Sequence, residues 1–457
     1  MRDDWTVVLY VLYVFIFMII AKLIKEKLGI FKSIIIPNAL LAGILGLIAG
    51  PEVLGIIDFE IEFYESIVFH FLGIGFIALT LSEKNTKQRQ NSVNSGLFIL
   101  STYCFQAVLG MIIVFIMIST VKPDLFFGLG LMLPLAFGQG PGFATAIGSS
   151  WEEVLNLGYT TQYGLTLATV GFLVGGILGV GLLNYYSRKY GVKTHSLRNL
   201  GGVNRKNYEI KSVSEINFYD MLTTQIVLVA GVYFITYFVM LYLTQGLNSL
   251  GEIGGTIGSL VKGFNHLFGI VVAILLKKLF EYLKKYKNAR TLELTDGYLM
   301  HNIASFSFNI MITASVMAIS IVTIKEYWEL LIFISLVGAV GTLLFVTYFA
   351  ERAFKNNQKL YSLAMFGMLT GTASTGLALL RGLDPNLETD VAEDLVLGSA
   401  IAAPLGIPLM VALSQPIIGY KTGNPIYYLV TFVAIFAYVV IIMTIMLLRA
   451  KKARLNK

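Results

Sequence analysis

Long apolar stretches separated by short polar connections run through the whole sequence. An α-helix needs about 17 to 25 apolar residues to cross the hydrocarbon core of a bilayer. Eleven stretches reach that length, at residues 5–21, 33–50, 66–82, 95–120, 163–187, 219–245, 255–280, 297–324, 327–350, 393–415 and 425–449. The pattern predicts an all-α polytopic membrane protein.

Two further apolar segments, 125–150 and 361–381, are interrupted by small and hydroxylic residues. The first contains Gly138-Gln139-Gly140-Pro141-Gly142, and the second contains Thr370-Gly371-Thr372-Ala373-Ser374-Thr375-Gly376. Non-helical backbone at membrane depth is tolerated only where it is buried in protein or lines a wet cavity. We therefore expect each segment to form a re-entrant hairpin. The alternative is that the glycines only allow close helix packing.

The distribution of lysine and arginine predicts the orientation, because short cytoplasmic loops are enriched in them. Acidic residues follow the second stretch, whereas basic clusters follow the first and third and occupy the connections near 188–211 and 284–290. The N-terminus is then outside and the C-terminus cytoplasmic, in a multi-pass protein of the inner (plasma) membrane. Segment 125–150 would enter from outside and segment 361–381 from the cytoplasm.

The two halves of the chain match each other at nearly constant spacing. Phe137, Gly138, Gly142, Ala144 and Thr145 correspond to Phe366, Gly367, Gly371, Ala373 and Ser374, each 229 residues later. Each half then holds five spans with a re-entrant loop between the fourth and fifth. Because five is odd, the second copy is inverted relative to the first, as in many secondary transporters that bind substrate at the midplane.

This repeat divides the chain into four parts. They are a first repeat (1–187), a cytoplasmic linker (188–218), a second, inverted repeat (219–415), and an additional C-terminal helix with a basic tail (416–457).

Composition supports a lipid environment and argues against several other functions. Only 13% of the residues are charged, against about a quarter in globular chains. The net charge of +7 is spread over short clusters between spans, so we expect no nucleic-acid partner. A single cysteine, Cys104, excludes a disulfide framework. The sequence has no hydrolase, zinc-protease or P-loop motif, so we expect neither an enzyme nor an organic cofactor.

Two opposed tips at the membrane centre would offer helix N-termini to an anion and backbone and hydroxyl oxygens to a sodium ion. Arg381 follows the second tip and has two interpretations of equal weight. It either faces a substrate carboxylate, or it snorkels to the interface or pairs with Asp384.

The broken segments resemble those of the bacterial sodium/glutamate symporter family. The similarity lies in Gly138-Gln139-Gly140-Pro141-Gly142 and Gly371-Thr372-Ala373-Ser374-Thr375, each between the fourth and fifth spans of a five-span repeat. The chain departs from the family pattern in three ways. Gln139 replaces a histidine and Pro141 a threonine, the second loop lacks the family proline, and the 425–449 span is extra.

The resemblance implies sodium-driven symport of glutamate or a related small organic anion by alternating access. Together with the residue patterns it gives a predicted site of Gln139, Gly140, Gly142, Thr145, Gly371, Thr372, Ser374, Thr375 and Arg381. The sodium ion is expected near Thr145, Thr372 and Ser374. An ion channel, a different amino acid or carboxylate, proton coupling, a membrane scaffold and a homodimeric assembly all remain open alternatives.

Overall fold

The computed structural model describes residues 4–27, 37–82, 90–190, 215–249, 258, 265–286, 295–384 and 389–455. Every regular element in these ranges is helical, which confirms the all-α class. The helices of the first half are α1 (Asp4–Lys27), α2 (Asn38–Ala49), α3 (Ile61–Ser82), α4 (Gln90–Thr120), η2 (Phe127–Leu131), η3 (Pro134–Gly138), α5 (Pro141–Leu155) and α6 (Thr160–Tyr190). Those that follow are α7 (Glu215–Asn248), α9 (Asn265–Tyr286), α10 (Gly297–Met317), α11 (Ile321–Ile324), α12 (Trp328–Ala353), α13 (Gln358–Leu369), α14 (Ala373–Arg381), α15 (Val391–Leu405), α16 (Ile407–Ala412), α17 (Gln415–Thr422) and α18 (Ile426–Leu455).

Each of the eleven expected stretches contains a helix, but not all of these helices have the length and composition of a span. Seven described helices do, or eight if α15 and the helical segment Ile407–Thr422, which meet at a 48° bend, are counted as one. Helix α2 has only 12 residues. Helix α9 carries Lys277, Lys278 and Glu281 in its second half. Helix α10 is continuous, but polar residues such as Asn302 and Asn309 interrupt its apolar sequence. The described fold is therefore that of a polytopic membrane protein with seven or eight clear spans.

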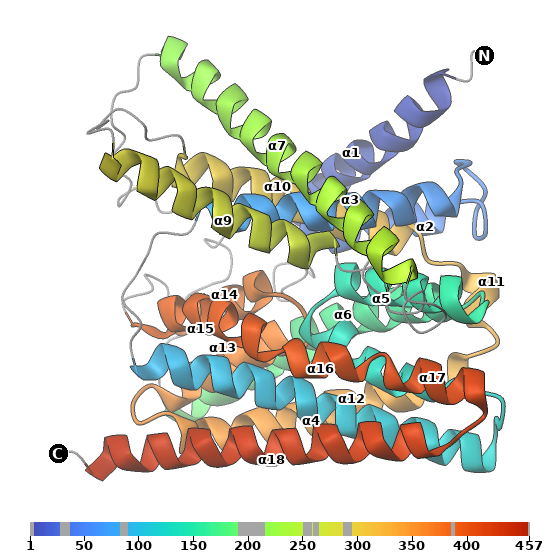
Figure 1. Cartoon of the computed structure of the whole chain (residues 1–457), viewed down its shortest axis with the longest axis vertical. Coiled ribbons are helices and arrows are strands. Elements are labelled where there is room, and N and C mark those ends of the chain that lie inside the picture. The colour runs from blue at the N-terminus through green and yellow to red at the C-terminus, as the bar shows by residue number, and fades with distance from the viewer. Residues whose placement is uncertain are drawn as a thin grey trace.

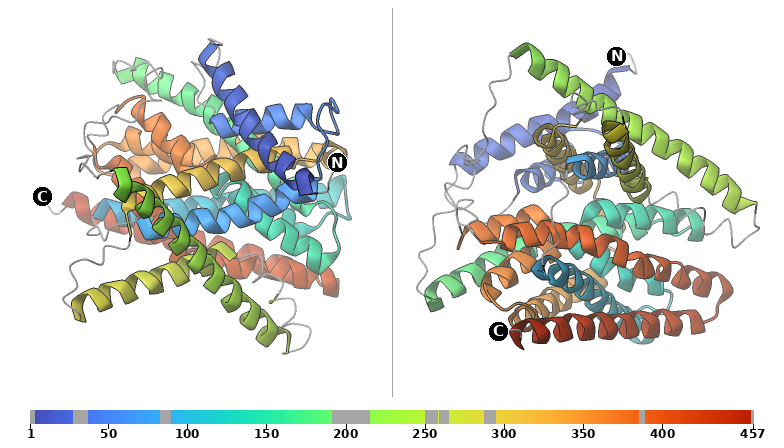
Figure 2. Two further views of the ribbon diagram at one scale, coloured as in Figure 1. Left: turned by 90° about the horizontal axis from the view of Figure 1, so that it is seen from above. Right: turned by 60° about the vertical axis from the view of Figure 1, so that its left-hand side comes forward.

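The helices form two layers (Figures 1 and 2). The upper layer in Figure 1 contains α1, α2, α3, α7, α9 and α10, and the lower layer contains α4, η2, η3, α5, α6 and α12 to α18. Each layer therefore combines elements from both halves of the chain. The first helices of each half build the upper layer, and the later helices of each half build the lower layer.

Packing within the upper layer is reciprocal between the two halves. Helix α2 packs against α10, and α9 packs against α3. A side chain supports each contact, because Thr313 Oγ1 donates to the carbonyl of Ala39 at 3.0 Å and Asn265 Nδ2 donates to the carbonyl of Phe69 at 3.0 Å. Helices α3 and α10 also pack against each other, as do α4 and α12 in the lower layer. Helices from the two halves of the chain thus pack against each other in both layers.

The additional helix α18 belongs to the lower layer, where it packs along α4. Near its C-terminus, Arg449 Nε donates to Asn94 Oδ1 at 3.4 Å. Asn94 in turn donates to the carbonyl of Ala353 at the end of α12. The last helix is therefore a structural part of the layer that holds both interrupted segments.

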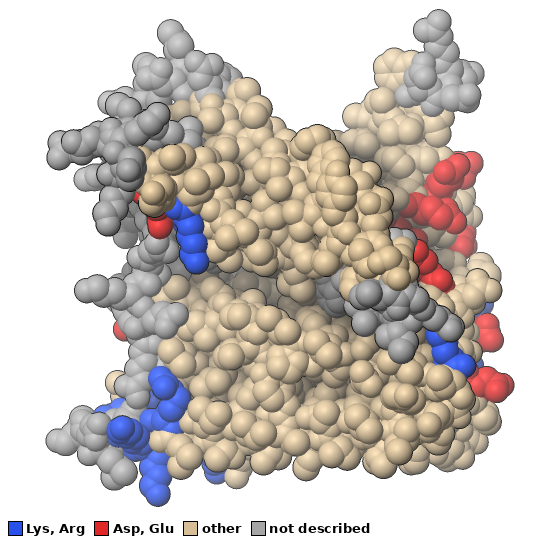
Figure 3. Space-filling view, viewed as in Figure 1, with Lys and Arg blue, Asp and Glu red and all other residues tan. Residues whose placement is uncertain are grey.

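Charged side chains gather at the two ends of the layers (Figure 3). The larger group of Lys and Arg lies at the end where α18 finishes, and the larger group of Asp and Glu lies at the opposite end. The α2–α3 connection lies at the acidic end in Figure 1, and it carries exposed acids that include Glu52, Asp58 and Glu60. The N-terminus lies at the acidic end and the C-terminus at the basic end.

Candidate functional site

The first interrupted segment breaks at Gly140. The π-helical turn η3 ends at Gly138, and α5 begins at Pro141, where a proline fits because the first helical position needs no N–H donor. Between them Gly140 has φ +86° and ψ −176°, a backbone conformation that is essentially restricted to glycine. The break predicted from Gly138-Gln139-Gly140-Pro141-Gly142 is therefore present.

The second interrupted segment breaks at Thr370, Gly371 and Thr372. Helix α13 ends at Leu369, and α14 begins at Ala373 with Thr372 as its N-cap in extended conformation. The Thr372 side chain does not cap the helix; its hydroxyl lies 3.5 Å from that of Thr375. The N-terminus of α14 therefore has no side-chain cap, and the same holds for the N-terminus of α5.

The two breaks meet in the lower layer. A Cβ atom placed on Gly140 would lie 3.8 Å from the carbonyl oxygen of Gly371 and 3.9 Å from Cγ2 of Thr372. From this point α5 and α14 run toward opposite ends of the molecule (Figure 1). Two helix N-termini, each a region of positive potential with free N–H groups, thus converge on one spot.

Helix α4 holds both breaks through two buried side chains one turn apart. Tyr103 donates its hydroxyl to the carbonyl of Gly138 at 3.2 Å, and Gln106 Nε2 donates to the carbonyl of Leu369 at 2.9 Å. The same Nε2 also donates to Thr342 Oγ1 on α12 at 3.0 Å. These bonds satisfy carbonyl groups that the interrupted helices leave without a helical partner.

Sequence analysis did not identify Tyr103 and Gln106 as site residues. A signal was present, because Gln106 is a polar side chain inside the apolar stretch 95–120, and such residues mark functional or structural polar contacts within a span.

Glycines of α6 allow this helix to lie against both breaks. A Cβ at Gly171 would lie 2.9 Å from both Phe137 and the Thr370 carbonyl oxygen, and one at Gly175 would lie 2.9 Å from Thr370 Oγ1. Gly164 and Gly179 make similar close approaches to Ala144 and Leu379. The glycines of α6 thus permit close packing around the two breaks.

The other predicted residues are distributed over η3, the second break, α5 and α14. Gly142 is buried next to Gly140, and Thr145 is buried one turn into α5, where its hydroxyl donates to the Pro141 carbonyl at 2.8 Å. Thr375 is buried at the start of α14, and Gln139 is half-buried at the end of η3. The side chain of Ser374 lies outside the described residues.

Arg381 is the predicted residue that the structure separates from the others. It ends α14, eight residues after Ala373, which corresponds to about 12 Å along the helix axis. Asp384, its expected alternative partner, accepts hydrogen bonds from the backbone and hydroxyl of Thr389 at 3.1 and 2.6 Å. Arg381 is half-buried and does not lie at the meeting point of the two breaks.

The first break also contacts the upper layer. A Cβ at Gly142 would lie 2.3 Å from Leu72 on α3 and 2.9 Å from Met311 Sδ on α10. The ring of Phe143 lies against Phe76 on α3 and against His266 on α9. By contrast, α13 and α14 pack against each other and against η3, α4, α6, α12 and α15, all members of the lower layer.

A set of hydrogen bonds around Gln162, here called the Gln162 junction, connects the upper and lower layers toward the acidic end. The side chain of Gln162 on α6 donates to Glu65 Oε1 on α3 at 2.8 Å and to the Ala318 carbonyl at 2.9 Å. Its own oxygen accepts from the Ser320 backbone N–H at 2.6 Å. Glu52 accepts from Ser320 Oγ at 2.8 Å and so extends the junction into the α2–α3 connection.

Comparison with protein-family models finds no match to this chain, and comparison with curated proteins finds no significant match.

Proposed function

We propose that the protein is a sodium-coupled secondary transporter that carries glutamate or a related small organic anion by alternating access. The observation that carries this proposal is the meeting of Gly140 with Gly371 and Thr372, which brings two helix N-termini from opposite directions to one position. We take this position as the substrate site.

The chemistry of the meeting point suits an anion with a small cation. Backbone N–H groups and the positive ends of α5 and α14 favour negative charge, as helix N-termini do in transporters with discontinuous helices. The Thr372 and Thr375 hydroxyls and the Gly371 carbonyl supply hard oxygen atoms, which suit sodium. Arg381 lies too far along α14 to reach this position, so we do not expect it to contact a substrate carboxylate in this conformation.

Inverted repeats with re-entrant loops give a simple account of the observed packing. If the second half is an inverted copy of the first, equivalent contacts must occur twice, and α2 on α10 is matched by α9 on α3. The opposite directions of α5 and α14 fit hairpins that enter from opposite membrane faces. The basic end would be cytoplasmic by the positive-inside rule, with the N-terminus outside.

The two layers supply a route to alternating access. The first break is packed against the upper layer and the Gln162 junction closes the layers toward the acidic end. The second break packs against lower-layer helices. We assign this conformation to a state closed toward the outside, and the opposite state would require the Gln162 junction to separate.

Uptake into proteoliposomes tests the proposal. Labelled glutamate, other amino acids and dicarboxylates are offered with an inward sodium gradient, with a proton gradient and with neither. We expect saturable, competable uptake of an anion that depends on the sodium gradient. Uptake driven by the proton gradient alone would show that the coupling ion is a proton and not sodium. Non-saturable flux would favour a channel, and absence of flux of any acid would reject transport.

A further inference from the structure

The basic end of the lower layer carries two neighbouring hollows that are open to the surface, here called cavities, and that the proposed transport site does not use. One, of about 610 Å³, is lined by Gly181, Asn184, Tyr185, Arg188 and Lys189 at the end of α6. The other, of about 370 Å³, is lined by Lys355, Asn357, Gln358, Lys359 and Leu360 in the α12–α13 connection and at the start of α13. Four of the ten lining residues are basic and none is acidic.

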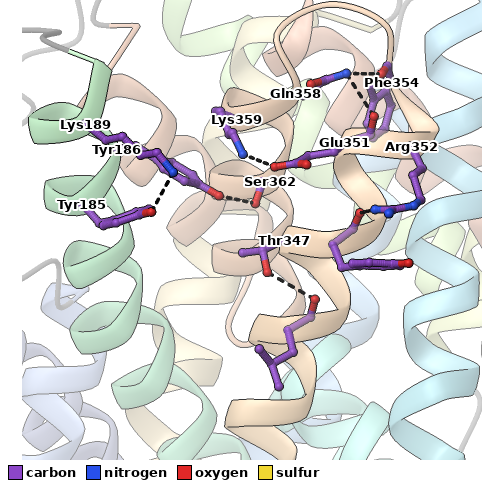
Figure 4. A network of polar contacts seen from close by, with 12 residues as sticks. Tyr185, Tyr186, Lys189, Thr347, Glu351, Arg352, Phe354, Gln358, Lys359 and Ser362 are labelled. Carbon is purple, nitrogen blue, oxygen red and sulfur yellow. Dashed lines mark hydrogen bonds and ion pairs between the residues drawn. The ribbon is translucent and has the colours of Figure 1, made fainter.

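Tyr186 lies next to residues of both cavities, since it follows Tyr185 in α6 and contacts Lys359 of α13. Its hydroxyl shares a hydrogen bond with Ser362 Oγ at 3.1 Å, and Lys359 Nζ lies 5.3 Å from the centre of its ring (Figure 4). Lys359 also forms an ion pair with Glu351, and Lys189 Nζ donates to the Tyr185 hydroxyl at 2.9 Å. Two of the four basic side chains, Lys189 and Lys359, are therefore held in place by neighbouring residues.

An apolar face continues from the α6 cavity toward the middle of the helix. Exposed residues follow helical spacing from Ile177 through Gly181 to Tyr185 and Arg188. Ile177 is 55% exposed, and a Cβ placed on Gly181 would meet no atom within 4 Å. One surface thus offers positive charge at the end of a span and an open apolar face beneath it.

We propose that these cavities bind the headgroup of an anionic phospholipid, with an acyl chain lying along the α6 face past Gly181. The candidate spans of α6 and α12 end at Lys189 and Ala353, at or next to the residues that line the cavities, and we infer from this that the cavities lie at headgroup depth. Basic pockets between helices at this depth suit phosphate groups, and tyrosines are common at the interface. A soluble anion would use the charge but not the apolar face.

Thermal stability of the purified full-length protein in detergent tests the site. Melting temperature is measured with added phosphatidylglycerol, phosphatidylcholine of the same chains, glycerol 3-phosphate or inorganic phosphate. We expect phosphatidylglycerol to raise the melting temperature more than the other three. The double variant Arg188→Gln/Lys355→Gln should lose at least half of that difference, since both side chains are exposed and each lines one of the cavities.

The double variant Lys451→Gln/Lys452→Gln is the matched control, because it removes the same charge from exposed positions near the end of α18 that do not line either cavity. It should keep the lipid effect. A third variant, Gly181→Phe, fills the open face without changing charge and should also reduce the effect. Equal losses in cavity and control variants, or equal stabilisation by both lipids, would overturn the proposal. Stabilisation by free phosphate equal to that by the lipid would show a soluble-anion site instead.

Discussion

At the first break, the backbone of Gly140 determines the local structure more than any side chain does. The space around Gly140 would accommodate a small side chain, since an added Cβ would lie no closer than 3.8 Å to another atom. Its conformation, φ +86° and ψ −176°, is the obstacle to any other residue. This conformation turns the chain from η3 into α5 and aims the α5 N-terminus at Gly371.

Replacing Gly140 with alanine should therefore destabilise the protein by about 1–3 kcal/mol through backbone strain and reduce uptake per folded molecule at least tenfold. Melting temperature and proteoliposome uptake measure the two effects. Gly423→Ala is the control: Gly423 has φ +63° with no atom near its Cβ position, and it lies away from both breaks. It should cost some stability and leave uptake per folded molecule unchanged. Equal uptake by the two variants would contradict a role for the Gly140 turn in the site.

Residue types and spacing predicted both breaks, because the proline of Gly140-Pro141-Gly142 removes a helical N–H donor and both segments concentrate glycine and hydroxylic residues inside an apolar stretch. The position of Arg381 could not be predicted in the same way. Whether a residue shortly after a break reaches the tip depends on where the next helix starts, and α14 begins at Ala373 and carries Arg381 to its far end.

Among the helices, α4 is the one whose side chains bind both interrupted segments. Its Tyr103 and Gln106 bind a carbonyl group from each interrupted segment, so the helix fixes the two breaks relative to each other. Hydropathy identified α4 as a span but gave no information on its partners. A hydrogen bond between residues 263 positions apart, as for Gln106 and Leu369, follows from tertiary packing and not from local pattern.

Gln106→Leu should destabilise the protein by about 1–3 kcal/mol, because the carbonyl of Leu369 loses its buried donor. It should also lower uptake, since the second break is no longer held against α4. Ser101→Ala on the same helix is the control, because the Ser101 hydroxyl donates to carbonyls of its own helix. Melting temperature and uptake are compared for both. If Ser101→Ala has as large an effect as Gln106→Leu, the bond to the second break is not what stabilises the site.

At the scale of the whole molecule, the two layers mix the halves of the chain, and this arrangement was partly predictable. The 229-residue correspondence predicts equivalent halves, and helices of the two halves do pack against each other in both layers, whereas the inverted relation of the halves stays a prediction. Which helices separate into which layer could not be predicted, because all spans are apolar and hydropathy does not distinguish a lipid contact from a helix contact. The Gln162 junction was also missed, since its partners are distant in the sequence.

The junction leads to a prediction about the balance between conformations. Gln162→Ala removes the hydrogen bonds to Glu65, the Ala318 carbonyl and the Ser320 N–H at once. If these bonds hold the layers closed toward the acidic end, the variant should open there more often, and a buried contact of the first break should become accessible. Leu72→Cys reports this opening, because Leu72 is 1% exposed and lies against Gly142.

The labelling is done in a Cys104→Ala background with a membrane-impermeant thiol reagent added from outside. The thiol introduced by Leu72→Cys should react severalfold faster in the presence of Gln162→Ala. Thr166→Ala is the control, because it lies one turn further along α6 and its hydroxyl donates to its own helix; it should leave the rate unchanged. An unchanged rate with Gln162→Ala would mean that apolar contacts such as that of Gly142 with Leu72 and Met311 hold the layers closed without the polar junction. The alternating-access proposal would then have to locate its outer barrier at those apolar contacts.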